Sequence, residues 1–145
     1  MPQARTAAQV KRSAVAVVIA FAVAMPGAHA AQTAMAATLR VAVDGISPAG
    51  GNLIVGIYDE ATFPLAPEMP LSSRTIVNVR GSATAVFERL PPGTYAVRVL
   101  QDVNHNGRAD AGEPTALSNA AGAGDFDGAA IVLHPGENSA AIHLH

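Results

Sequence analysis

The sequence predicts an all-β protein, a single antiparallel β-sandwich of about seven strands that follows a cleavable export signal. Three observations lead to this expectation. Short stretches in which apolar and polar residues alternate recur along the chain, and this is the period of strands with one buried face. Turns rich in glycine and proline separate these stretches. No segment after residue 30 sustains the period of a helix.

The first thirty residues, 1–30, have the three-part layout of a secretory signal peptide. Basic residues come first, an uncharged apolar run follows over residues 14–25, and an Ala-His-Ala sequence ending at Ala30 offers the small residues that signal peptidase requires. We expect cleavage after Ala30. An uncleaved membrane anchor is the alternative, but a spanning helix needs about 20 apolar residues, and this run has only 12.

The chain has no cysteine, and this excludes a lipid-anchored form of the exported protein. Neither lipid attachment at a mature N-terminal cysteine nor disulfide bonding is available to it. We therefore expect a periplasmic or secreted bacterial protein, with the periplasm favoured, and no transmembrane segment after processing. Residues 31–37 predict a flexible leader. Residues 38–145 predict one domain of ordinary size, which we expect to be a monomer.

The charge of the exported part excludes one class of partner. After cleavage, six arginines and eleven carboxylates remain, a formal charge of −5, and there is no lysine. The chain has neither a basic stripe nor an aromatic stacking platform, so nucleic acid is not an expected partner. The partner that we expect is an unknown ligand or a component of the cell envelope.

Seven stretches carry the strand pattern, and each ends at turn residues. In the first of them, Leu39, Val41 and Val43 alternate with small or polar residues. Residues 61–72 break the pattern because three prolines remove hydrogen-bond donors, so this segment is predicted to be a loop. The predicted strands are residues 39–43, 52–58, 74–79, 83–90, 95–99, 129–134 and 139–144.

The clearest inward face belongs to the fifth predicted strand. Tyr95, Val97 and Val99 alternate with residues such as Arg98, which points the other way. The residues that we expect beside them in the core are Leu53, Val55, Ile57 and Phe87. The Pro-Gly-Glu-Asn sequence at residues 135–138 predicts a hairpin turn between the last two strands.

A loop with calcium-ligand spacing lies between the fifth and sixth predicted strands. If Asp102 is position 1 of a twelve-residue loop, oxygen-bearing side chains fall at positions 1, 3, 5, 9 and 12, and glycine falls at position 6. Position 7 contributes only its backbone carbonyl, so the Arg108 side chain is expected to turn toward solvent. The predicted calcium ligands are Asp102, Asn104, Asn106, Arg108 through its carbonyl, Asp110 and Glu113.

A metal-free ordered turn is the competing interpretation, because Asp, Asn and Gly are also the residues that turns prefer. Five matched oxygen side chains and the glycine exceed what turn preference alone requires, so calcium is favoured as the cofactor. The loop follows a strand and not a helix, so the behaviour of a helical EF-hand is not implied.

The sequence offers no recognisable catalytic constellation. It has no cysteine, no G-x-S-x-G elbow and no serine whose neighbours suggest a base. We therefore expect a non-catalytic binding or structural module. The alternative is a cell-envelope hydrolase that uses Asp102, Asp110 and Glu113 as acid and base groups. A concave pocket around these carboxylates would favour the enzyme.

The sequence does not predict a metal site built from histidines. His143 and His145 share a strand face, but no third ligand is evident, and a solvated chain end is the favoured interpretation. His105, at loop position 4, is expected to point away from any ion and to be exposed.

Two motifs, in this order, resemble a family of exported bacterial proteins, the domain of unknown function 2141. The first runs from Leu90 to Val97 and contains Pro-Pro-Gly-Thr-Tyr. The second is the loop from Asp102 to Asp110, followed by Glu113-Pro114 and Ser118-Asn119. The resemblance implies a transthyretin-like or immunoglobulin-like sandwich and no particular activity. The chain lacks the C-terminal Tyr-Arg-Gly-Ser of transthyretin-like hydrolases, so their activity is not implied.

Overall fold

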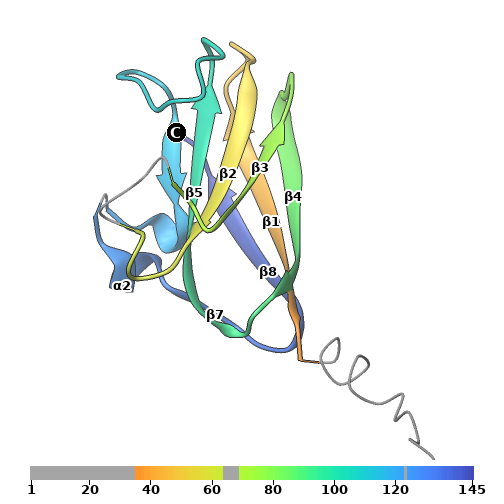
Figure 1. Ribbon diagram of the computed structural model, residues 1–145. Helices are drawn as coiled ribbons and strands as arrows, with labels where there is room; N and C mark the ends of the chain where they lie inside the picture. The colour runs from red at the N-terminus through yellow and green to blue at the C-terminus, as the bar shows by residue number, and fades with distance from the viewer. Residues whose placement is uncertain (1–34, 64–68, 123) are drawn as a thin grey trace, which may run out of the picture.

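The computed structural model describes residues 35–63, 69–122 and 124–145. The predicted signal peptide, most of the predicted leader and part of the predicted proline-rich loop lie outside these ranges. The described residues form eight strands and two short helical segments (Figure 1). In chain order they are β1 (Ala37–Ile46), β2 (Asn52–Tyr58), β3 (Ser72–Ile76), β4 (Gly81–Leu90), β5 (Gly93–Asp102), β6 (Thr115–Leu117), the 3-10 turn η1 (Ser118–Ala120), α2 (Phe126–Ala129), β7 (Ile131–Leu133) and β8 (Gly136–His143).

The strands form two sheets that pack face to face, as Figure 1 shows. The three-stranded sheet has the order β4-β1-β8. The five-stranded sheet has the order β3-β2-β5-β6, and β7 pairs with the first part of β5. The predicted all-β sandwich is therefore confirmed. One pairing departs from the expected antiparallel pattern, because β1 and β8 run parallel.

The predicted hairpin at residues 135–138 is wrong. β7 pairs with β5 in one sheet, whereas β8 begins at Gly136 and pairs with β1 in the other. The chain crosses between the sheets at this point, and the Asn138 side chain holds the crossover. Its oxygen accepts the N–H of His134 at 3.0 Å, and its amide donates to the carbonyls of His134 and Gly136 at 2.8 and 2.9 Å. These turn residues therefore mark a change of sheet.

The core lies between the sheets and is filled by alternate residues of the long strands. All of the side chains predicted to point inward are buried, and most of them are 0% exposed. The predicted core residues found there are Leu53, Val55, Ile57, Phe87, Tyr95, Val97 and Val99. From β1, Leu39, Val41 and Val43 fill the opposite side of the core. The period of two therefore identified the buried face of each of these strands correctly.

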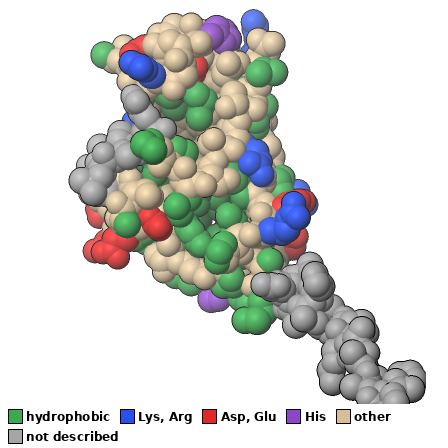
Figure 2. Space-filling view, viewed as in Figure 1, with side chains coloured by type: hydrophobic (Ala, Val, Ile, Leu, Met, Phe, Trp, Pro, Cys, Tyr) green, Lys and Arg blue, Asp and Glu red, His purple; other side chains and the backbone are tan. Residues whose placement is uncertain are grey.

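A smaller apolar cluster covers one end of the outer face of the five-stranded sheet. The rings of Tyr58 and Phe63 meet edge to face with centroids 6.1 Å apart, and Phe63 meets Phe126 at 5.5 Å. Ala96 and Ala129 complete the cluster. On the side of the molecule drawn in Figure 2, hydrophobic side chains gather in the lower middle and charged side chains lie toward the edges.

The sequence did not predict β6, η1 or α2, because each has only three or four residues and no period can be recognised over so short a length. The α2 turn begins after Asp125, whose carboxylate accepts the N–H of Gly128 at 2.9 Å. No helix in the described part of the chain is long and apolar enough to cross a membrane.

Candidate functional site

The predicted calcium loop starts from a buried and firmly held strand end. Asp102 is the last residue of β5 and pairs with Asn52 of β2. The preceding residue, Gln101, is 0% exposed and is hydrogen-bonded to the turn between β1 and β2. Its amide donates to the carbonyls of Ser47 and Gly50 at 3.0 and 2.7 Å, and its oxygen accepts the N–H of Ser47 at 2.9 Å. The first residue of the loop is therefore fixed by the sandwich itself.

The Asp102 carboxylate faces into the loop. It is only 2% exposed, and it accepts the N–H groups of Asn106 at 3.1 Å and Gly107 at 2.9 Å. These bonds need a backbone that turns back sharply on itself. His105 and Gly107 supply the turn, with φ values of 63° and 75° in the left-handed region. Glycine at loop position 6 thus has the conformational role that the sequence predicts.

Three side chains of the loop meet at one point. One oxygen of the Asp110 carboxylate accepts the side-chain amide of Asn104 at 2.7 Å and also that of Asn106. The oxygens of Asn104 and Asn106 accept the N–H groups two residues further on, at 3.0 and 2.8 Å. Hydrogen bonds from Asn104 and then Asn106 hold the pKa of Asp110 below its usual value, so this exposed group is ionised at neutral pH.

Glu113 closes the loop. One of its carboxylate oxygens accepts the N–H groups of Val103 and Asn104 at 2.8 and 3.3 Å, and the other accepts that of Asp110 at 3.1 Å. Its charge is therefore directed at backbone groups from both halves of the loop. This pattern explains why an acidic residue stands at position 12 even before any ion is considered.

The predicted ligands therefore fall into three groups. Asn104, Asn106 and Asp110 come together, Asp102 holds the loop backbone from the strand side, and Glu113 holds it from the far end. In the part of the chain that the structure describes, no three Asp, Glu or His side chains are grouped in a way that could hold a metal ion. Any ion in this loop would consequently rely on amide and backbone oxygens as well as carboxylates.

The described histidines take no part in the hydrogen bonds that join Asn104, Asn106 and Asp110. His105 is exposed, as predicted. His143 and His145 are exposed at the end of the chain, with ring centroids 5.0 Å apart, and the ring of His143 contacts the carboxylate of Asp44 on β1. The parallel pairing of β1 and β8 sets Asp44 opposite His143, which the predicted hairpin did not foresee.

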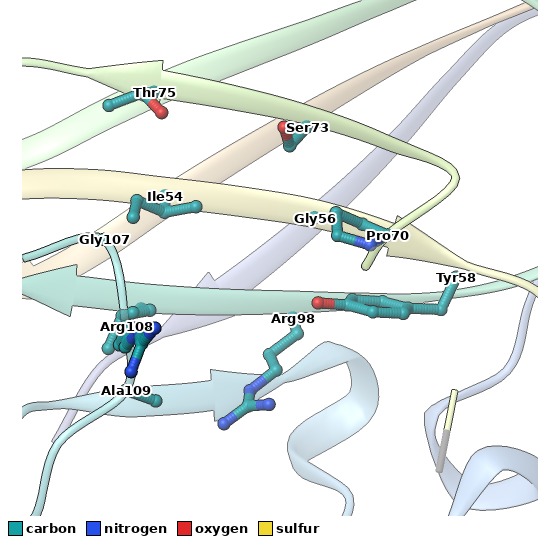
Figure 3. Close-up of a pocket in the computed structure, with 11 residues that line it drawn as sticks. Ile54, Gly56, Tyr58, Pro70, Ser73, Thr75, Arg98, Gly107, Arg108 and Ala109 are labelled. Carbon is teal, nitrogen blue, oxygen red and sulfur yellow. The ribbon is translucent and has the colours of Figure 1, made fainter. Parts of the chain in front are cut away.

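A hollow of ≈ 430 Å³ lies beside the loop, on the outer face of the five-stranded sheet. Figure 3 shows the Tyr58 ring lying along the sheet and the side chains of Arg98 and Arg108 on the same side of β5. Arg108 is exposed, as expected, but its side chain lines this hollow. The described lining residues include none of the three loop carboxylates.

The turn before β5 and the loop after it both lie within the stretch of the chain that matches a bacterial family. The family described as an uncharacterized protein conserved in bacteria (DUF2141) matches residues 41–141, a range that includes both motifs. The chain belongs to this family. The resemblance found in the sequence is thus confirmed. No curated protein and no solved structure matches the chain.

Both motifs of this DUF2141 protein have structural roles. The Tyr95 hydroxyl donates to the carbonyl of Pro91 at 2.8 Å and closes the turn before β5. Ser118 is 1% exposed; its hydroxyl accepts the N–H of Val97 at 3.0 Å and donates to the carbonyl of Ala129. The Asn119 amide donates to the carbonyl of Ala130 at 2.9 Å. Ser118 therefore fastens the segment after the loop to β5 and to α2, and Asn119 fastens it to the residue that follows α2.

Two residues beside the loop, Gln101 and Arg98, have surroundings that the sequence did not predict. Gln101 carried a signal, since it continues the inward alternation of Tyr95, Val97 and Val99 with a polar side chain, and a buried polar group needs partners. Arg98 was placed correctly on the opposite face, but the hollow into which it faces depends on β3 and the loop. The sequence around Arg98 does not indicate that β3 and the loop lie beside it.

Proposed function

We propose that this DUF2141 protein is a non-catalytic binding or structural module exported by a bacterium, and that calcium orders its loop of residues 102–113. One observation carries the proposal. The side chains of Asn104, Asn106 and Asp110 converge next to the buried carboxylate of Asp102. Calcium takes six to eight oxygen ligands in flexible geometry, and a loop that gathers oxygens from alternate residues suits it.

The charge balance of the loop supports a cation. Asp102 is almost fully buried, and within the described residues it forms no ion pair. Two N–H bonds offset part of its desolvation, and a nearby cation would offset the rest. The exposed carboxylate of Asp110 adds a second negative charge, which is hydrogen-bonded to two side-chain amides and is partly offset by the charge of Arg108.

The amide oxygens of the loop are compatible with the same ion. The oxygens of Asn104 and Asn106 each accept one N–H, and a carbonyl oxygen has a second lone pair. The oxygen and nitrogen of an amide also exchange places by a half-turn of the group, which would turn oxygen toward Asp110 once a cation lies between them. The remaining ligands that we propose are the carbonyl of Arg108 and the carboxylate of Glu113.

The non-catalytic part of the proposal rests on where the loop carboxylates lie. Asp102 and Glu113 are directed at backbone N–H groups, and Asp110 is directed at two side-chain amides. None of the three is among the described residues that line the adjoining hollow. A hydrolase that used them as an acid–base pair would need them to face a shared cleft.

Calcium should raise the melting temperature of the protein. If the ion binds only the folded form, a concentration of about 100 times the dissociation constant adds about 2.7 kcal/mol to the free energy of unfolding. For a domain of this size, the melting temperature then rises by roughly 10 °C. Thermal melts in chelator and in millimolar calcium measure the rise. Magnesium should give a smaller one, because it demands a tighter octahedron and retains its waters.

Matched variants connect this rise to the loop. Asp110→Ala and Asp102→Asn should each remove most of it, because each takes away a carboxylate ligand. His105→Ala should keep it, because the His105 side chain is exposed and takes no part in the hydrogen bonds that join Asn104, Asn106 and Asp110. Equal melting temperatures in chelator and in calcium would leave residues 102–113 as an ordinary turn.

Export should be visible as proteolytic processing. The signal-like layout of residues 1–30 supports a mature protein that begins at Ala31 and resides in the periplasm or the medium. The intact mass of protein recovered from the periplasm of an expressing bacterium should correspond to residues 31–145. A full-length species that stays in the membrane fraction would contradict the export proposal and leave the calcium proposal standing.

A further inference from the structure

We propose that the hollow on the outer face of the five-stranded sheet binds a small hydroxylated anion, with Arg98 and Arg108 holding a carboxylate or phosphate on a body about the size of a sugar. The site goes beyond the calcium proposal, because Arg98 belongs to β5 and its position does not depend on an ion in the loop. The charge, the floor and the walls of the hollow each support this assignment.

Arg98 brings to the hollow a positive charge that forms no ion pair among the described residues. Arg98 is half-buried in the middle of β5, in register with Gly56 on one side and Leu117 on the other. Within the described residues, neither Arg98 nor Arg108 forms an ion pair and no carboxylate lines the hollow, although the charge of Arg108 acts on the nearby Asp110. A partly buried guanidinium that lacks an anion is costly, and its planar set of donors suits carboxylate and phosphate groups. An anionic ligand would supply the missing partner.

The floor of the hollow depends on a glycine inside a strand. A Cβ at Gly56 would lie 3.0 Å from Cε2 of the Tyr58 ring and 3.2 Å from Cβ of Pro70. Glycine weakens a strand interior, and it is found there where another group must approach the backbone closely. At this position it lets the Tyr58 ring lie flat along the sheet, with the hydroxyl directed toward the Arg98 side of the hollow (Figure 3).

One wall of the hollow carries hydroxyl groups, whereas apolar residues such as Ile54 and Leu100 complete the lining. Ser73 and Thr75 of β3 project into it two residues apart, in register with Gly56 and Ile54 of β2. Their hydroxyls donate and accept hydrogen bonds, as the hydroxyls of a sugar-like body require. The volume of ≈ 430 Å³ lies in the range of small-ligand sites. Arginines at one side and hydroxyls at the other therefore match an anion joined to a hydroxylated body.

The test is a chemical-shift titration of the isotope-labelled protein, in calcium-containing buffer, with three probes: glucuronate, glucose phosphate and uncharged glucose. We expect at least one charged probe to shift the signals of Gly56, Thr75 and the Arg98 side chain, with a dissociation constant of about 1 mM or tighter. The charged probe that binds more tightly distinguishes a carboxylate ligand from a phosphate ligand. Failure of both charged probes in the millimolar range, or equal binding of glucose, would overturn the proposal.

Three charge-matched variants localise the binding. Arg98→Gln and Arg108→Gln should each weaken it by roughly tenfold, the effect of losing one charge-assisted hydrogen bond. Arg80→Gln, which removes the same charge from an exposed turn, should leave it unchanged. Equal weakening by Arg80→Gln, or no weakening by Arg108→Gln, would overturn the site.

Arg108 is exposed, so Arg108→Gln is expected to fold. It therefore still tests anion binding if Arg98→Gln fails to fold. The calcium-induced rise in melting temperature should persist in Arg98→Gln, since Arg98 lies on β5 and is not among the proposed calcium ligands. Loss of anion binding and loss of calcium binding are therefore separate outcomes.

Discussion

Replacing Gln101 with alanine is expected to lower the free energy of unfolding by about 3 kcal/mol or more. The side chain is 0% exposed and makes three hydrogen bonds to the turn between β1 and β2. Its removal takes a partner from the buried carbonyl of Gly50 and two hydrogen bonds from the half-buried Ser47, and a buried group that loses its partner costs about 1 to 3 kcal/mol. Urea denaturation monitored by circular dichroism measures the change.

Gln101→Met separates hydrogen bonding from packing. Methionine fills nearly the same volume without donors or acceptors, so it should destabilise the protein almost as much as alanine does. Wild-type stability in the methionine variant would show that packing alone matters at this position. Because Gln101 immediately precedes Asp102, both variants should also loosen the start of the loop.

Gly51→Ala is expected to be far more harmful than the same change at the neighbouring Gly50. Both glycines have positive φ, 99° and 78°, so both variants carry a backbone strain of about 1 to 2 kcal/mol. A Cβ at residue 51 would also lie 2.4 Å from the carbonyl oxygen of Asp102 and 2.7 Å from Cα of Val103. Nothing lies within 4 Å of a Cβ at residue 50.

The expected loss for Gly51→Ala is therefore roughly 3 to 4 kcal/mol, from strain together with overpacking against the backbone. Gly50→Ala should lose only about 1 kcal/mol or slightly more. Parallel denaturation curves of the two variants give the difference directly. Equal losses of unfolding free energy would mean that the close approach of Gly51 to Asp102 and Val103 does not occur in solution.

Much of the fold could be predicted because alternation is a local property. Val97 and Val99 enter the core for the reason visible in the sequence, and the turn residues around them set the ends of β5. The partner of a strand is not a local property. The pairing of β8 with β1 joins residues about 100 positions apart, and the Pro135–Asn138 segment has the composition of a hairpin although it changes sheets.

The loop could be predicted in outline for a similar reason. The spacing of Asp102, Asn104 and Asn106 fixes which oxygens face the inside of a curled backbone, and the structure has that curl. The spacing did not indicate that Glu113 accepts N–H groups from both halves of the loop. The hollow beside Arg98 depends on β2, β3, β5 and the loop at once, and only the folded sheet brings these segments together.

Calorimetric titration of calcium into the chelator-stripped protein tests the central claim most directly. We expect one ion per chain, with a dissociation constant in the range of about 10⁻⁴ to 10⁻³ M that is typical of extracellular modules, or tighter. Binding should be lost in Asp110→Ala and kept in His105→Ala. The absence of binding heat at millimolar calcium in a protein that folds normally, or equal binding by the wild type and Asp110→Ala, would contradict the claim that calcium orders this loop.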